Sequence, residues 1–255
     1  MIAGLLAAAR ECTEVVVAGS LVDAVLAGEA DLAVISAADV VDTPGMVIGA
    51  VLKRADARDA LCAAEGVTLA TLPAGATVGV SSALRLAELG SRRTDLVAVE
   101  TTVDADAALA LVESGELDAA ILAVDDLFRL NRLAAVSDYF GIDGWPTAAG
   151  QGALAVVVRS GDEATVKSLG HAVSRTLVDA ERLTVALLGV TNPVAVNAIV
   201  DDGMLFVSGR VYTTDGSERV TSSHALYVSD SNDPAGELAA RVSTELLDLG
   251  AAKLA

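Results

Sequence analysis

The stretch LPAGATVGVSSALRLAEL, residues 72–89, predicts a turn, a strand and a helix in direct succession. Pro73 and Gly75 indicate the turn, because proline restricts the backbone and glycine adopts conformations that other residues avoid. The apolar residues 77–80 predict a buried strand. The serines that follow are typical helix caps, and the predicted helix covers residues 82–93 with Gly90 near its end. A strand that leads directly into a helix is a building unit of α/β folds.

The same alternation of strands and helices extends to both sides of this stretch. Alternation of this kind implies parallel sheets covered by helices. The predicted strands lie at 13–19, 31–37, 45–54, 95–101 and 117–124, and the predicted helices at 20–30 and 104–116.

The pattern changes after about residue 171. Residues 171–189 predict one long helix that ends at a glycine. Three short strands joined by DDG and TDG turns follow, and residues 235–250 predict a closing helix. The last third of the chain therefore predicts a small α+β domain with an antiparallel sheet.

Composition excludes several classes of protein. The 255 residues include 17 Lys and Arg against 35 Asp and Glu, so the formal net charge is −18. Nucleic acids and anionic membranes are bound through clustered Lys and Arg, so neither is expected as a partner. No apolar run is long enough to cross a membrane, and the first residues resemble a short amphipathic helix rather than a signal peptide. Cys12 and Cys62 lack metal or disulfide spacing, so we expect a cytoplasmic protein without a metal site.

Five stretches carry a resemblance to known motifs. They are residues 28–40 (GEADLAVISAADV), 51–61 (VLKRADARDAL), 72–89, 114–130 (SGELDAAILAVDDLFRL) and 148–159 (AAGQGALAVVVR). In that order they are similar to GRADIAVHSxKDVP, xxEREDPRDAL, LPxGxxVGTSSLRRQAQL, EGEYDAIxLAxAGLKRL and xVGQGALGIExR. These are motifs of the hydroxymethylbilane synthase family, also called porphobilinogen deaminase. The chain resembles this family from about residue 24 to its end.

The resemblance implies an α/β fold of three domains. Two βαβ domains like the lobes of a periplasmic binding protein would face each other over a cleft, and a small α+β domain would follow. Residues 1–56 and 153–170 would form the first, residues 57–152 the second and residues 171–255 the third.

The family reaction condenses four porphobilinogen molecules and releases ammonia at each step. The product grows on a dipyrromethane cofactor that a thioether joins to one cysteine. Each pyrrole carries two carboxylates, which require arginines with bidentate geometry. Positive charge that develops on the pyrrole nitrogens requires a carboxylate nearby.

The resemblance places Asp39 at the family's catalytic aspartate. An aspartate after a buried strand is also a common helix cap or turn residue, and the neighbouring family Lys and His are Ala38 and Ile35 here. Both readings of Asp39 stay open.

The cofactor position has changed. The family segment GGCQVPIG corresponds to LGVTNPVAV, which places Val190 where the cofactor cysteine belongs. Valine cannot form a thioether, so no dipyrromethane cofactor is expected.

Only some of the residues that bind the pyrrole carboxylates in the family have counterparts in this chain. Ser82 and Arg85 match the second serine and second arginine of SSLRRQ, while Arg129 and Arg159 match arginines of two later motifs. The family segment RGNVxTR has no basic counterpart, because no Lys or Arg occurs between Arg93 and Arg129. Each lost buried contact would weaken binding by roughly 2–5 kcal/mol.

Three functions are compatible with these residues, and enzymatic activity stays uncertain. We favour a degenerate homologue that lacks the transferase reaction and has a regulatory or partner-binding role. A two-lobed binding protein for a small anionic or pyrrole ligand is the second, and an active synthase with another cofactor attachment is the third. Gly150 and Gly152 predict a sharp turn that leads back from the second domain, as a fold element or beside a ligand.

Overall fold

The structure is a computed structural model, and it describes residues 20–254. The predicted helix at the start of the chain, the strand at 13–19 and Cys12 lie outside these residues. The chain divides into two compact units, residues 1–54 with 153–175 and residues 55–152 with 176–255. The bounds of the first unit differ by at most five residues from those predicted for the first domain, residues 1–56 and 153–170. The division into three domains stays a prediction.

The first unit holds a three-stranded sheet with the order β1-β8-β2. Both β1 and β2 pair antiparallel with β8 between them, so the expected parallel sheet is wrong for this unit. The chain leaves this unit after β2, passes through residues 55–152 and returns as β8. Strand β8 enters between β1 and β2 and runs opposite to both. The elements are α2 (Leu21–Leu26), β1 (Leu32–Ser36), β2 (Met46–Val51), β8 (Leu154–Arg159) and α6 (Glu163–Val166).

The second unit begins with a five-stranded mixed sheet of order β5-β4-β6-β3-β7. Strand β4 pairs parallel with β5 and β6, as the alternation of strands and helices predicted, whereas β3 pairs antiparallel with β6 and β7. Its strands are β3 (Asp59–Ala63), β4 (Thr77–Val80), β5 (Val97–Glu100), β6 (Ala119–Ala123) and β7 (Val136–Tyr139). Its helices are α3 (Ala83–Gly90), α4 (Ala105–Glu113) and α5 (Val124–Arg129).

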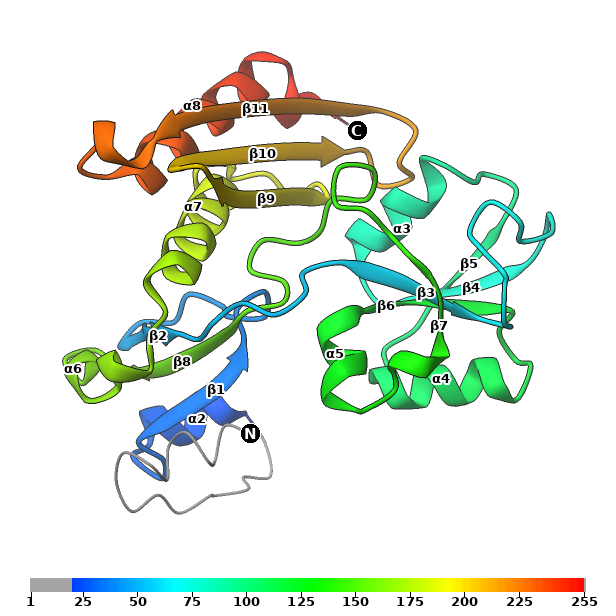
Figure 1. Ribbon diagram of the computed structural model, residues 1–255, viewed down its shortest axis with the longest axis horizontal. Coiled ribbons are helices and arrows are strands. Elements are labelled where there is room, and N and C mark those ends of the chain that lie inside the picture. The colour runs from blue at the N-terminus through cyan, green and yellow to red at the C-terminus, as the bar shows by residue number, and fades with distance from the viewer. Residues whose placement is uncertain (1–19, 255) are drawn as a thin grey trace. The chain divides into compact units, whose positions relative to one another are not determined.

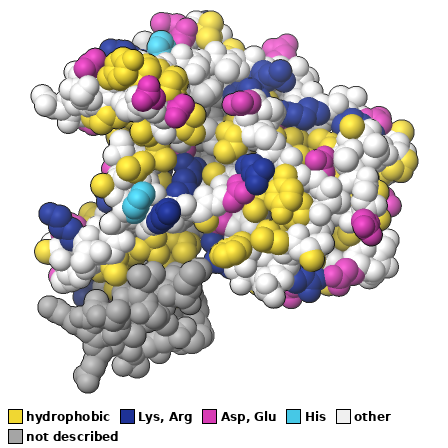
Figure 2. Space-filling view, in the orientation of Figure 1, with side chains coloured by type: hydrophobic (Ala, Val, Ile, Leu, Met, Phe, Trp, Pro, Cys, Tyr) yellow, Lys and Arg dark blue, Asp and Glu magenta, His cyan; other side chains and the backbone are white. Residues whose placement is uncertain are grey.

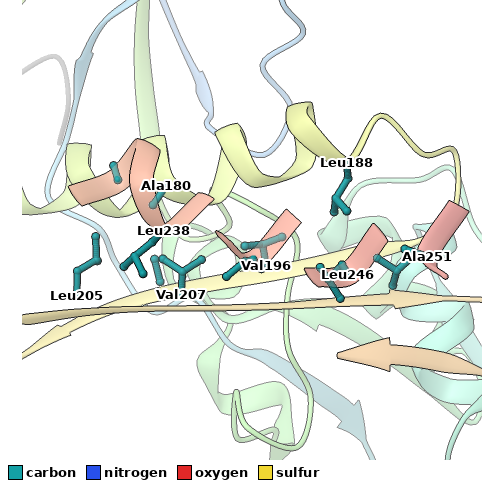
Figure 3. Close-up of a cluster of buried hydrophobic side chains, with 12 residues drawn as sticks. Ala180, Leu188, Val196, Leu205, Val207, Leu238, Leu246 and Ala251 are labelled. Carbon is teal, nitrogen blue, oxygen red and sulfur yellow. The ribbon is translucent and has the colours of Figure 1, made fainter. Parts of the chain in front are cut away.

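The rest of the second unit is an antiparallel sheet of order β11-β10-β9, which confirms the predicted strands (Figure 1). Apolar side chains of α7 and α8 meet those of the sheet in one buried cluster (Figure 3). Leu205, Leu238 and Leu246 in this cluster are fully buried. The elements are α7 (Ala172–Leu188), which belongs to this unit from Thr176 on, β9 (Val194–Asp201), β10 (Met204–Tyr212), β11 (Arg219–Tyr227) and α8 (Pro234–Asp248).

Acidic and basic side chains are mixed over the face drawn in Figure 2. Within residues 20–254, no helix combines the length and the apolar composition that a bilayer crossing requires. The same residues contain no group of three or more His, Cys, Asp or Glu side chains arranged to hold a metal ion.

Candidate functional site

The start of helix α3 carries two of the predicted binding residues, Ser82 and Arg85. Ser82 lies two residues after the end of β4 with an extended backbone, and its Oγ accepts a hydrogen bond of 3.2 Å from the Arg85 amide. This is an N-cap, which satisfies one of the amides that a helix start leaves without a partner. Ser82 is therefore part of the helix end and presents Arg85 one turn later.

Arg85 forms a buried ion pair with Asp59, the first residue of β3. Arg85 Nη2 lies 2.7 Å from Asp59 Oδ1, and Arg85 Nε donates to Asp59 Oδ2 over 3.1 Å. The side chains are only 13% and 2% exposed. Burial opposes the charge on the guanidinium, but the attraction of Asp59 outweighs it and keeps the pKa of Arg85 above its ordinary value.

Further donors complete the surroundings of this pair. Trp145 Nε1 donates to Asp59 Oδ2 over 3.1 Å, and Gln151 Nε2 donates to Asp59 Oδ1 over 2.8 Å. Arg85 Nη1 donates to Ser81 Oγ over 2.8 Å. The Asp59 carboxylate thus accepts four hydrogen bonds, and Arg85 is held by groups of the chain itself.

Arg129 is also paired with acidic side chains. Its guanidinium donates to Asp125 over 2.6 Å and forms a second ion pair with Asp126. Asp125 is 4% exposed, and burial is the main cause that raises the pKa of its carboxyl, against the opposing effect of Arg129. Both aspartates also favour the charged form of Arg85, so the two ion pairs are electrostatic neighbours. Two arginines and three aspartates make this group of side chains net negative, which disfavours an anion.

The predicted glycine turn packs against the chain's own backbone. Gly152 has a φ of +78°, and a Cβ at that position would lie 2.8 Å from the Ala57 Cα. Gln151 Nε2 donates to the Ala57 carbonyl over 2.9 Å, and the Gly150 amide donates to the buried Glu181 Oε2 over 2.7 Å. The turn therefore joins residue 57 to helix α7 within the second unit.

Asp39 and Arg159 lie in the first unit. Asp39 is exposed in the turn after β1, and no helix follows before β2, so the turn interpretation agrees with its position and the helix-cap interpretation does not. Arg159 Nη1 donates to the carbonyls of Val25 and Ala30 over 2.8 and 2.9 Å, and Arg159 Nε donates to Asp162. Arg159 thereby binds one carbonyl in the last turn of α2 and one in the segment that follows this helix.

Val190 follows the end of α7. Gly189 has a φ of +58° and ends the helix, as the sequence predicted. Val190 is partly buried and packs against the apolar cluster of α7, α8 and their sheet. The valine therefore has a structural place in this core.

Comparison with known proteins assigns the chain to a family. The family model described as "Porphobilinogen deaminase, dipyromethane cofactor binding domain" matches residues 13–167. The porphobilinogen deaminase of Leifsonia xyli subsp. xyli is 43% identical, over 94% of this chain and 78% of its own length. The chain belongs to the porphobilinogen deaminase family. The porphobilinogen deaminase of Thermobifida fusca is 39% identical, over 91% of this chain and 76% of its own length.

A solved structure resembles the chain less closely. The periplasmic aliphatic sulphonate binding protein SsuA from Escherichia coli is 18% identical and covers 65% of this chain and 56% of its own. The TM-score of the two structures is 0.39. The assignment to the porphobilinogen deaminase family therefore rests on the sequence relatives.

The two acidic partners of Arg129 differ from the residues of the family motif at these positions. Asp125 and Asp126 stand where the family motif LAxAGLKRL has Ala and Gly. The substitution brings the partners of Arg129 onto its own helix, at spacings of three and four residues. Sequence reasoning noticed the surviving arginine but not these partners, although the comparison with the motif contained the signal.

Sequence reasoning also missed a buried polar group at the other end of α3. Glu88 is fully buried, accepts the hydroxyl of Tyr212 and pairs with Arg92. Burial is the main cause that raises the pKa of Glu88 above 4.5, and the donors from Tyr212 and Arg92 offset it only in part. The family motif SSLRRQAQL has a neutral glutamine at this position.

The raised pKa of Glu88 predicts a pH dependence of stability. A carboxyl whose folded-state pKa lies above its unfolded value of 4.5 stabilises the fold most below that pH. This contribution is lost as the pH rises through the folded-state pKa. We therefore expect the Glu88→Gln variant to become more stable relative to the parent protein as the pH is raised from 4 to about 7. Urea unfolding at a series of pH values measures the difference.

Glu245→Gln is the control with the opposite sign. Hydrogen bonds from Ser222 and His224 lower the pKa of Glu245, so its contribution is present above 4.5 and is lost as the pH falls. This variant should become less stable relative to the parent as the pH rises. If the stability of both variants relative to the parent changed in the same direction with pH, the opposite pKa shifts of Glu88 and Glu245 would be contradicted.

Proposed function

We propose that this chain is a porphobilinogen deaminase homologue, of tetrapyrrole and heme biosynthesis ancestry, that carries no dipyrromethane and does not condense porphobilinogen. Its function would then be regulatory or partner-binding, in the cytoplasm. The proposal is carried by Val190, which the motif resemblance places at the position of the cofactor cysteine and which packs against the core.

The residues present do not fit the cofactor. A thioether forms from a thiolate, and the Val190 side chain contains only carbon and hydrogen. Because Val190 contributes to the apolar cluster, a reactive group at this position would also have to leave that packing. We therefore derive no step through dipyrromethane.

Cys62 does not replace the missing thiol. Its side chain lies on β3 and is 1% exposed. Burial raises the pKa of the Cys62 thiol to about 12, so the reactive thiolate is scarce at neutral pH. Cys62 is the one cysteine among residues 20–254.

The state of the arginines supports the same conclusion. Arg85 and Arg129 are each held by carboxylates in the second unit, and Arg159 supports helix α2 in the first. A carboxylated pyrrole would have to compete with Asp59 for Arg85 and with Asp125 for Arg129. The net negative charge of that group also counts against the second candidate, a binding protein for a small anion.

An assay with porphobilinogen tests the proposal. The purified protein should form no hydroxymethylbilane above the blank without enzyme, measured as the absorbance of oxidised uroporphyrin. Its intact mass should stay unchanged after the incubation, because no pyrrole becomes attached. An authentic synthase is the positive control, and circular dichroism shows that the protein is folded.

One variant, Val190→Cys, sharpens the assay. Val190→Cys supplies a thiol at the family position, and we expect it to remain inactive because the arginines are still paired. Product from the unaltered chain, or a pyrrole adduct on its mass, would overturn the proposal and establish the active synthase. Product from Val190→Cys alone would show that the missing thiol is the whole defect.

A further inference from the structure

Tyr212 connects two segments that are far apart in the sequence. It is the last residue of β10, and its side chain is fully buried. Its amide donates to the Pro193 carbonyl over 3.0 Å, and its carbonyl accepts from Asn192 Nδ2 over 3.1 Å. Its hydroxyl donates to Glu88 on α3. One residue thus binds the loop after α7 with its backbone and helix α3 with its side chain.

The same helix also contacts the turn between β10 and β11. A Cβ on Gly216 would lie 1.9 Å from the Ala87 carbonyl oxygen, and a Cβ on Gly90 would lie 2.2 Å from the Asp215 carbonyl oxygen. Backbone therefore packs directly on backbone, with no room for a methyl group on either side. Helix α3 is held at its C-terminal half by both the turn and Tyr212.

The loop has additional anchors of its own. Asn192 Nδ2 also donates to the Leu254 carbonyl over 3.1 Å. Val190 packs against the apolar cluster, and Leu84, Ala87, Ala195 and Tyr212 form a small buried cluster between α3 and the sheet. The loop, the sheet and α3 are therefore in continuous contact.

We infer that Tyr212 is a positioning residue that makes helix α3 and the loop 189–193 one rigid body. The N-terminal end of that helix carries Ser82 and Arg85, and the loop carries Val190. The position of residue 190 relative to Arg85 is consequently fixed by the fold. This inference goes beyond the proposed function and holds whether or not the chain is an active enzyme.

Hydrogen exchange measured by mass spectrometry tests the inference. Tyr212→Phe keeps the ring and the backbone bonds but removes the hydroxyl that binds Glu88. We expect exchange at least about tenfold faster in both residues 83–90 and residues 189–196, because the buried hydrogen bond to the Glu88 carboxyl is lost. Strands β4 and β6 should be unchanged. Tyr227→Phe makes the same chemical change at a half-exposed position of β11 and should alter neither segment.

Two variants of Glu88 test the inference independently. Glu88→Ala removes the acceptor and should reproduce the pattern of Tyr212→Phe, whereas Glu88→Gln keeps an acceptor oxygen and should preserve protection of both segments. If Tyr212→Phe does not fold, this pair decides alone. Faster exchange in only one segment, or unchanged exchange in both, would overturn the inference.

Discussion

Replacing Asp59 with alanine is expected to lower the free energy of unfolding by about 3–5 kcal/mol, because it leaves a buried guanidinium without its counterion. Asp59 is 2% exposed and binds Arg85 with both carboxylate oxygens. The substitution also removes the acceptor for Trp145 Nε1 and for one bond of Gln151. Both donors would be left buried without an acceptor. A buried donor without an acceptor costs more free energy than an average hydrogen bond contributes.

Urea unfolding followed by tryptophan fluorescence measures this loss. The chain contains one tryptophan, and Trp145 lies beside Asp59, so the signal reports on this site directly. Asp126→Ala is the matched control, because Asp126 also pairs with an arginine but its side chain is 47% exposed. The control should change stability by less than about 1 kcal/mol. Equal losses for both variants would show that the buried Asp59–Arg85 pair stabilises the fold no more than an exposed pair does.

The same pair explains why a surviving arginine does not indicate a surviving binding site. Arg85 matches the family motif, yet each of its three guanidinium nitrogens donates to Asp59 or Ser81. A ligand that recruits Arg85 has to replace a strong buried pair with one of similar strength, so most of the gain cancels. Residue identity alone therefore overstates how much of the binding set remains available.

Local sequence signals predicted the elements whose ends are chemically marked. Helix α3 begins after a serine cap, as predicted, and ends at Gly90, three residues before the predicted end. Helix α8 begins at Pro234, one residue before the predicted start. The three strands β9–β11 were predicted because short strand-like segments are joined by DDG and TDG turns. These signals act over a few residues, so a single sequence contains them in full.

Elements defined by distant partners were not predicted. The segment DALCA of β3 has no alternation and begins with a charged residue, yet it is a strand because it lies between β6 and β7. The antiparallel place of β8 depends on pairs such as Leu32 with Val158, which no local pattern reveals. The partners of Arg85 and Glu88 escaped prediction for the same reason. A sequence motif identifies the residue, but its binding partner can be identified only from the folded structure.

Gly216→Ala is the second substitution with a large expected effect, a loss of about 2–5 kcal/mol in the free energy of unfolding. Gly216 has a φ of +76°, which penalises any residue with a Cβ by about 1–2 kcal/mol. The added methyl would also lie 1.9 Å from the Ala87 carbonyl oxygen of α3. Neither backbone can yield without separating the turn from the helix, and overpacking of this kind adds about 1–3 kcal/mol.

Gly203→Ala separates the two causes. Gly203 lies in the neighbouring hairpin turn, has a nearly equal φ of +75°, and a Cβ there would meet no atom within 4 Å. This variant should therefore lose only the backbone penalty of about 1–2 kcal/mol. The difference between the two variants, measured by urea unfolding, gives the strength of the contact between α3 and the turn of β10 and β11. A difference near zero would mean that this contact is loose, and then α3 and the loop at residue 190 could not move as one body.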